Sequence, residues 1–369
     1  MVENSKYLTE QIITYIGNKR SLLDFIGKSV DIVKKELNQN KLKTADLFSG
    51  SGIVARYLKQ HSSDLYVNDL ENYATTINKC YLTNKSEISE EELDKWYKYL
   101  KENLVDEKLE KGFITELYSP SDDNHIIEGE RVFYKSRNAK YIDTERKLLD
   151  ELPEKYKILF LGPLLYEASN RTNTSGVFKG FYKNSETNIG QFGGNGKNAL
   201  KRILSDIEVK KPILSNFDCK VNIYQEDTVK LVEKLPVLDF VYLDPPYNQH
   251  PYGSNYFMLN LINDYKKPEK ISKVSGIPEK WNKSCFNKKA TALQMMESIC
   301  KKLKTKYILI SFNSEGFITF EEMVKMLSSY GSVRVFDKKY STFKAARNLR
   351  NRDLYIKEYL FLLKKECEV

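Results

Sequence analysis

Asp244, Pro245, Pro246 and Tyr247 are the residues whose types and spacing best suit chemistry, and they directly follow the apolar run 240–243. That run is short, aromatic and β-branched, so it predicts a buried strand that ends at the two prolines, which cannot donate to a sheet ladder. A carboxylate and a backbone carbonyl placed there could accept both hydrogens of an exocyclic amine, and the Tyr247 ring offers a flat face for an extruded base. The pattern indicates chemistry on a nucleobase amino group; the alternative is a strand that merely ends in a proline turn.

A glycine-containing turn at residues 46–52 (Asp-Leu-Phe-Ser-Gly-Ser-Gly) lies between a predicted strand at 44–48 and a predicted helix at 53–60. Glycines in such a turn let the backbone approach a ligand in front of a helix N-terminus. Asp69 ends the next predicted strand, at 64–68, where a carboxylate could hold the two ribose hydroxyls of an adenosine. The pair favours a nucleotide-like cofactor over a plain strand-to-helix turn.

Two shorter stretches carry weaker signals. Residues 15–20 (Tyr-Ile-Gly-Asn-Lys-Arg) place an aromatic ring, a glycine and two cations before a helix. Lys19 could meet a carboxylate such as that of a methionine moiety, or simply begin a basic helix. Asp227, just after a predicted strand at 221–224, could accept a hydrogen bond from an adenine amine, or belong to a solvated turn.

The composition indicates a protein with a hydrophobic core and a well-hydrated surface, because 41% of its 369 residues are hydrophobic and 30% are charged. Its 59 Lys and Arg exceed its 50 Asp and Glu, which favours a polyanionic partner or a solvated lysine-rich surface. Five scattered cysteines and three histidines form no metal-ligand spacing, so neither a metal nor a cysteine nucleophile is expected. The chain has no membrane span or secretion signal, so a cytoplasmic protein without a membrane partner is expected.

The alternation of predicted strands and helices indicates an α/β fold: a Rossmann-like, doubly wound, mostly parallel sheet. The runs 332–336 and 355–363 predict an antiparallel pair at one edge. Between residues 81 and 208 the pattern changes to charged helices and polar loops, with short strands expected among the loops of 170–198. We therefore expect a catalytic domain of residues 1–80 and 209–369, interrupted by a mainly helical, mixed target-recognition domain at 81–208.

With these motifs in place, the chain resembles the alpha-class, Dam-like N6-adenine DNA methyltransferases that use S-adenosylmethionine, especially those of restriction-modification systems. The resemblance rests on residues 15–19, 46–52, 68–69 and 244–247, with the cofactor half first, an insertion next and Asp-Pro-Pro-Tyr last. Less specific likenesses at 171–178, 311–316 and 340–359 extend it over nearly the whole chain. Tyr15 stands where many relatives carry Trp, and should still pack against the cofactor.

The resemblance implies roles for particular residues. Asp244 and the carbonyl of Pro245 would bind the target N6, and Tyr247 would stack on the flipped adenine, with Pro246 completing the catalytic motif. Asp69 would hold the ribose, and the glycine turn would wrap the methionine part. The expected contacts with S-adenosylmethionine are Tyr15, Lys19, Asp46, Phe48, Gly50, Gly52, Asp69, Asp227 and Asp244.

Two segments have the side chains that hold a duplex, since cations meet phosphates while amides and guanidinium groups read base edges. The first lies in the insertion and comprises Arg171, Asn173, Lys179, Tyr182 and Lys183. The second is a basic run near the C-terminus with Lys344, Arg347, Arg350 and Arg352. The alternative for each is a charged, solvated loop.

We therefore predict a site-specific enzyme that transfers the methyl group of S-adenosylmethionine to N6 of a flipped adenine in double-stranded DNA. Transfer would be direct, and the protein would act as a monomer, as the modification enzyme of a restriction-modification system. Methylation of cytosine N4, an RNA substrate, and a DNA-binding regulator with an inactive site are the alternatives. Neither the recognition sequence nor the existence of a cognate endonuclease is decided by the sequence.

Overall fold

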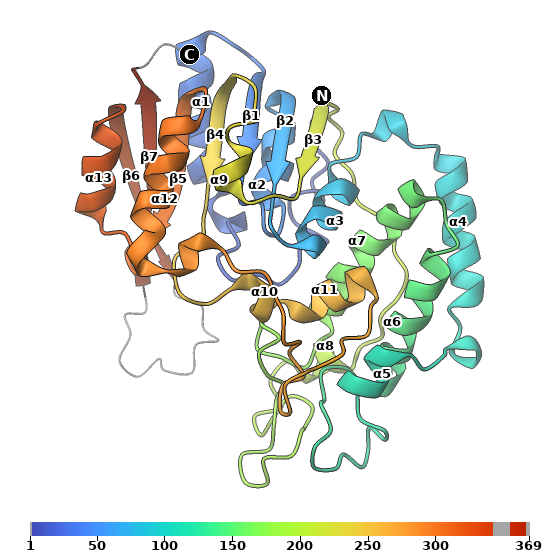
Figure 1. Cartoon of the computed structure of the whole chain (residues 1–369). Helices are drawn as coiled ribbons and strands as arrows, with labels where there is room; N and C mark the ends of the chain where they lie inside the picture. Colours follow the sequence, from blue (N-terminus) through green and yellow to red (C-terminus); the bar gives the residue numbers. More distant parts are fainter. Residues whose placement is uncertain (1, 342–354, 367–369) are drawn as a thin grey trace.

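A seven-stranded sheet occupies the upper left of Figure 1 in the computed structural model, which describes residues 2–341 and 355–366. The first five strands in sheet order are parallel, and β7 runs antiparallel to both β5 and β6. This confirms the predicted doubly wound, mostly parallel sheet with an antiparallel edge pair. The sheet order is β3 (Lys220–Tyr224), β2 (Ser62–Asn68), β1 (Leu42–Asp46), β4 (Leu238–Leu243), β5 (Thr305–Asn313), β7 (Tyr355–Lys365) and β6 (Gly331–Ser341).

The central strand β4 is apolar from Phe240 to Leu243 because helices cover both faces of the sheet. Phe240 and Tyr242 point to the core shared with α1 (Leu23–Leu37) and α2 (Ile53–Lys59). Val241 and Leu243 point to the opposite core, which contains α9 (Thr228–Leu231), α12 (Lys289–Lys302) and α13 (Phe320–Ser328). The alternation along one strand thus divides the sheet between two apolar layers.

The strand order reverses between β1 and β4: the chain runs outward from β1 through β2 to β3, then returns to β4 on the other side of β1. In open α/β sheets ligands bind at such a switch point, at the carboxyl ends of the strands. Here those ends carry the glycine turn after β1 and Asp244 after β4. The topology therefore brings the two strongest sequence motifs together.

A third apolar core joins the insertion to other parts of the chain. It contains α3 (Asn72–Tyr81), α4 (Glu90–Asn103), α5 (Phe113–Tyr118), α6 (Ser136–Leu149), α7 (Glu154–Asn170) and, from much later in the sequence, α11 (Phe257–Asp264). Gly162 lets α7 approach α3 closely, because a Cβ there would lie 2.5 Å from the Cys80 sulfur. The segment after β4 thus packs on the insertion, a contact that the sequence pattern did not indicate.

The loops at 170–198 contain no strand, only an isolated bridge between Lys183 and Gly190. Left-handed backbone at Asn188, Gly193 and Gly194 interrupts the extended conformation, so the expected short strands were wrong. The remaining elements are short: α8 (Leu200–Leu204), α10 (Tyr252–Asn255) and the 3₁₀ turns η1 (Arg20–Leu22), η2 (Lys85–Glu87), η3 (Asp106–Lys108) and η4 (Cys285–Asn287). None of the described helices is both long enough and apolar enough to span a membrane.

Arg56 on α2 anchors the N-terminal segment that leads to Tyr15 and Lys19. Its guanidinium is buried and donates to the backbone carbonyls of Tyr7, Glu10 and Gln11. It also lies 3.6 Å from the centre of the Tyr81 ring. The carbonyls of Tyr7 and Gln11 are buried, so they would lose their donor without gaining access to water if the guanidinium were removed.

We predict that Arg56→Met lowers the free energy of unfolding by about 3 kcal/mol, because it leaves buried carbonyl groups unsatisfied. Urea unfolding followed by circular dichroism measures this loss. The exposed Lys35→Met on α1 is the control, and should change stability by less than about 0.5 kcal/mol. Equal effects of the two variants would contradict the anchoring role.

Candidate active site

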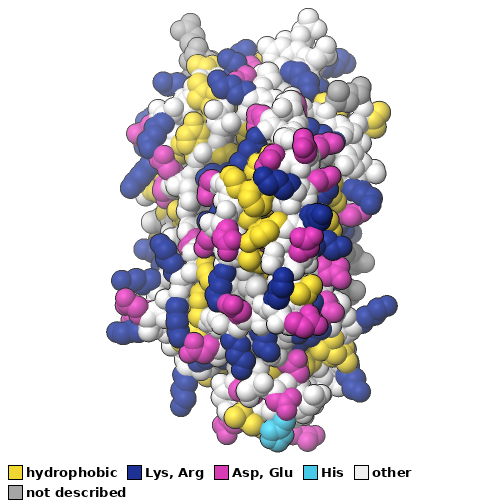
Figure 2. Space-filling model, turned by 90° about the vertical axis from the view of Figure 1, so that its right-hand side faces the viewer, with side chains coloured by type: hydrophobic (Ala, Val, Ile, Leu, Met, Phe, Trp, Pro, Cys, Tyr) yellow, Lys and Arg dark blue, Asp and Glu magenta, His cyan; other side chains and the backbone are white. Residues whose placement is uncertain are grey.

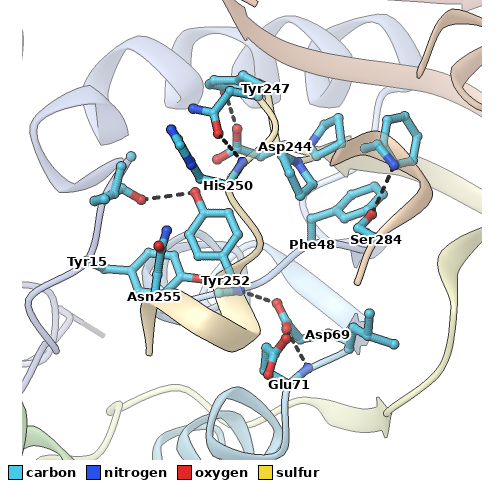
Figure 3. A pocket seen from close by; sticks show the side chains of 18 of the residues that line it. Tyr15, Phe48, Asp69, Glu71, Asp244, Tyr247, His250, Tyr252, Asn255 and Ser284 are labelled. Carbon is cyan, nitrogen blue, oxygen red and sulfur yellow. Dashed lines mark hydrogen bonds between the residues drawn. The ribbon is translucent and has the colours of Figure 1, made fainter. Parts of the chain in front are cut away.

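A cavity of about 770 Å³ opens at the carboxyl ends of the central strands, at the switch point. It is lined by all four residues of the Asp-Pro-Pro-Tyr motif and by eight of the nine predicted cofactor contacts. Asp244 and Tyr247 lie at one end of it, and Asp69 and Glu71 at the other (Figure 3). Gly52 is the one predicted cofactor contact that does not line the cavity. It is the N-cap residue of α2, has φ +76° and faces Asn78. The predicted residues that line the cavity are Tyr15, Lys19, Asp46, Phe48, Gly50, Asp69, Asp227, Asp244, Pro245, Pro246 and Tyr247.

Asp244 is held by its neighbours through one carboxylate oxygen only. Lys19 Nζ lies 3.3 Å from Oδ1, and the Tyr247 hydroxyl donates to the same atom. No hydrogen bond is found at Oδ2 among the described residues, so this oxygen can accept a hydrogen bond from a ligand amine. Burial raises the pKa of Asp244 to about 6, while Lys19 opposes that rise and Glu358 adds to it.

Lys19 has a different setting from the predicted one. Its side chain is almost fully buried, and its ammonium contacts the Tyr247 hydroxyl at 2.8 Å, Glu358 Oε1 at 2.8 Å and Asp244. These three contacts match the three donors of an ammonium group. The carboxylates around Lys19 in the structure belong to the protein, and its expected contact with a cofactor carboxylate stays a prediction.

The glycine turn and Asp69 form the other end of the cavity. Gly50 has φ +50°, and a Cβ there would lie 2.7 Å from the Tyr15 ring, so only glycine fits without displacing that ring. Asp69 accepts the backbone N–H of Gly50 at 2.7 Å and that of Glu71 at 2.9 Å. Each carboxylate oxygen keeps a further lone pair, so Asp69 can still accept a ligand hydroxyl.

Asp46, at the end of β1, is buried, and neither of its carboxylate oxygens has a hydrogen-bond partner among the described residues. Burial, and next the nearby Asp244, raise the pKa of Asp46; the backbone amides of Phe48 and Ala55 lie near it without forming a hydrogen bond, and offset this rise only in part. A buried carboxylate without a partner is costly and suits a cationic group of a ligand.

An aromatic wall closes the side near α9. Phe48 meets Phe286 edge to face at 5.4 Å between ring centres. Asp227 caps α9 by accepting the Val229 amide through Oδ1, and lines the cavity beside this wall. A flat apolar ring with an amine at its edge would fit between these groups.

Several cavity residues come from a stretch that the sequence analysis did not identify, after the Asp-Pro-Pro-Tyr motif. Tyr252 stacks on Tyr15 with ring centres 4.9 Å apart, and Asn282 donates to the carbonyl of Leu70 at 3.1 Å. Ser284 and Asn287 form a capping box, whose Ser-x-x-Asn spacing was the one available signal. Glu71 was also missed: burial raises its pKa to about 7 although Asn260 and Asn282 donate to it.

The residues that were predicted to contact DNA lie in different parts of the structure. Asn173 is fully buried, with its amide bonded to the carbonyls of Val132 and Gln191 and to the amide of Gly193, so its assignment to DNA is corrected. Lys179 is exposed at the cavity mouth, 3.4 Å from His250. The other three, Arg171, Tyr182 and Lys183, are partly exposed away from the cavity lining, while Lys344, Arg347, Arg350 and Arg352 lie outside the described residues.

Comparison with known proteins agrees with this geometry. A family model for D12 class N6 adenine-specific DNA methyltransferases matches residues 15–326. The type II methyltransferase M.CviAII of Paramecium bursaria Chlorella virus 1 is 30% identical, over 95% of this chain and 98% of that protein. M.NlaIII of Neisseria lactamica is 26% identical (96% and 99% covered), and M.FokI of Planomicrobium okeanokoites is 28% identical (95% and 52% covered).

We predict that Asp46→Asn stabilises the ligand-free protein by about 1 kcal/mol at pH 7.5, because it removes an unpaired buried charge. Since the folded-state pKa of Asp46 is raised, its ionisation weakens the fold as pH rises above the unfolded value near 4, and the gain should shrink at pH 5. Urea unfolding at both pH values tests this, with the exposed Asp31→Asn as control. An Asp46→Asn variant that is less stable than wild type would contradict the proposed cost of burying this carboxylate.

Proposed function

Because this chain belongs to the family of D12 class N6 adenine-specific DNA methyltransferases, we propose that its cavity holds a flipped adenine against a bound methyl donor. One observation carries the proposal: Asp244 Oδ1 is occupied by Lys19 and Tyr247, while Oδ2 is left for the amine of a base. The protein is a site-specific methyltransferase.

Asp244 and the carbonyl of Pro245 would accept the two hydrogens of the adenine amine. This draws the nitrogen lone pair away from conjugation with the ring and aims it at the methyl group. The proton released on transfer would reach Asp244 or solvent. Tyr247, whose hydroxyl is tied to Asp244, would present its ring to the base, and Phe312 supports that ring at 4.8 Å between centres.

The chemistry of the cavity fits S-adenosylmethionine, which supplies an activated methyl group on a sulfonium centre when bound. Asp46, Asp69 and Asp244 all line the cavity, so its local charge favours a ligand with a sulfonium and an ammonium. Asp46 would take the ammonium, Asp69 the ribose hydroxyls, and Asp227 with Phe48 and Phe286 the adenine moiety. Each assignment uses a group whose remaining hydrogen-bonding capacity or apolar surface suits that part of the cofactor.

We further propose that the substrate is double-stranded DNA and that the protein acts as a monomer. We also propose that it is a modification enzyme of type II, since its relatives M.CviAII and M.NlaIII are named type II methyltransferases. The adenine-specific family match favours N6 of adenine over N4 of cytosine, and the intact Asp-Pro-Pro-Tyr geometry speaks against an inactive regulator.

The segment 266–283 extends the predicted DNA surface. It contains six lysines and two glutamates, and its lysines are exposed. Arg131 donates to the carbonyl of Lys273 and the Tyr118 hydroxyl to that of Gly276, so the segment is held on the insertion, among the loops at the lower end of Figure 1. Asn282, at its end, lines the cavity. By contrast, both signs of charge are interspersed over the face that carries α4 (Figure 2).

We predict that Asp244→Asn reduces the transfer of labelled methyl groups to DNA by at least about 100-fold, because the amide is a weaker acceptor and carries no charge. Single-molecule sequencing of DNA from a methylation-free host that expresses the wild-type chain should show modified adenine in one sequence context. The exposed Asp31→Asn is the control and should transfer normally. Absence of modified adenine with the wild type would refute the proposal.

We predict that replacing Lys270 and Lys273 together by Gln weakens DNA binding roughly three- to tenfold near physiological salt, and lowers the salt dependence by about one ion per lost phosphate contact. Fluorescence anisotropy across a salt series measures both quantities. The matched control replaces Lys98 and Lys101, exposed on α4, by Gln. If both double variants bind alike, the segment does not contact DNA.

A further inference from the structure

We infer that Glu358 on β7 is a positioning residue for methyl transfer, which shares the Lys19 ammonium with Asp244 and thereby keeps Asp244 a strong acceptor that is correctly oriented toward the target amine. This inference rests on the proposed function, since it assigns a role at the same site. Glu358 was not among the predicted site residues, and it lies 114 positions after Asp244 in the sequence.

The contacts of Glu358 are specific. Its side chain is only 3% exposed, and Oε1 accepts hydrogen bonds from Lys19 Nζ at 2.8 Å and from Ser311 Oγ at 2.7 Å. The Tyr247 hydroxyl lies 3.3 Å from the same oxygen. Glu358 therefore contacts both groups that hold Asp244 Oδ1.

The position of Glu358 follows from the antiparallel strand. Because β7 enters the sheet beside β5, Glu358 pairs with Asn313 and its side chain reaches Ser311 on the same face. Its other neighbour in the sheet, Lys338 on β6, faces it across the strand pair. A carboxylate is costly to bury at this place unless it has a charged partner, and Lys19 is that partner.

The net charge of the group explains why the carboxylates of Asp244 and Glu358 share the single ammonium of Lys19. A buried pair of Lys19 and Asp244 alone would be neutral, and Asp244 would be a weak acceptor. With Glu358 the group carries a net charge of −1, so an ionised Asp244 retains acceptor strength at Oδ2. Ser311 and Lys19 together keep Glu358 itself from approaching the base in place of Asp244.

The experiment compares wild type with Glu358→Gln, which keeps the shape and removes the charge. We expect kcat for methyl transfer at pH 7.5 to fall at least tenfold, with KM for S-adenosylmethionine and Kd for DNA within threefold of wild type. Removal of a neighbouring negative charge favours ionised Asp244, so the acidic limb of the kcat profile, expected near pH 6 in wild type, should move to lower pH.

The other groups that face Asp244 are unchanged in this comparison, so they cannot cause the shift. They are Lys19 before α1, Asp46 on β1, Tyr242 on β4, Tyr247 after it and Tyr252 on α10. Carboxyl ¹³C NMR titration of Asp244 in the full-length protein should show the same shift of its pKa to a lower value, and this measurement does not depend on turnover.

Two further variants keep the test decisive. Glu358→Asp retains the charge and should recover part of kcat with an acidic limb like that of wild type. Asp337→Asn removes an exposed carboxylate from the adjacent strand β6 and should leave kcat and the pH profile unchanged. If Glu358→Gln does not fold, Glu358→Asp and Ser311→Ala should each lower kcat without changing Kd for DNA.

The outcomes separate the two proposals. A wild-type kcat and acidic limb in Glu358→Gln would overturn the inference, as would a loss of binding and rate together without movement of the limb or of the Asp244 titration. A wild type that binds DNA and cofactor but transfers no methyl group would refute the proposed function, and the NMR titration would then still decide whether Glu358 controls Asp244.

Discussion

The burial of the Lys19 ammonium is the interaction on which the active site depends. An ammonium removed from water needs compensating charge, and here Asp244 and Glu358 provide it from two different strands. The three groups constrain one another, so the segment before α1, the end of β4 and the antiparallel strand β7 must all be in place before the site exists. The Arg56 contacts that hold the N-terminal segment therefore serve the chemistry although they lie outside the cavity.

Strand order supplies the rest of the arrangement. Because β1 and β4 are neighbours whose connections leave in opposite directions, the two motifs that end these strands face one cavity. The same edge gathers Asp46, Asp69 and Asp244, and burial raises the pKa of each. A site with this charge is costly for the empty protein and favourable for a cationic cofactor, which is the usual compromise between stability and function.

The insertion is coupled to this site through shared packing. Helix α11 completes the core of the insertion, while Tyr252 and Asn255 just before it and residues of the later stretch 282–287 line the cavity. Glu71 reinforces the connection, since Asn260 and Asn282 both donate to its carboxylate beside Asp69. The insertion is thus attached to the cavity by hydrogen bonds and apolar contacts.

The sequence by itself determined the features that depend on neighbouring residues: the apolar strands, the glycine turn, the proline end of β4 and hence the two halves of the cavity. Tertiary structure decided what depends on residues far apart in the sequence. It buried Asn173, it added the stretch after Asp-Pro-Pro-Tyr to the site, and it gave Lys19 protein carboxylates as partners. The hydrophobic periodicity and the turn residues of a sequence indicate which face of an element is apolar and where that element ends. They contain no information on which strand lies beside it, and the contact between Lys19 and Glu358 exists only because β7 pairs with β5.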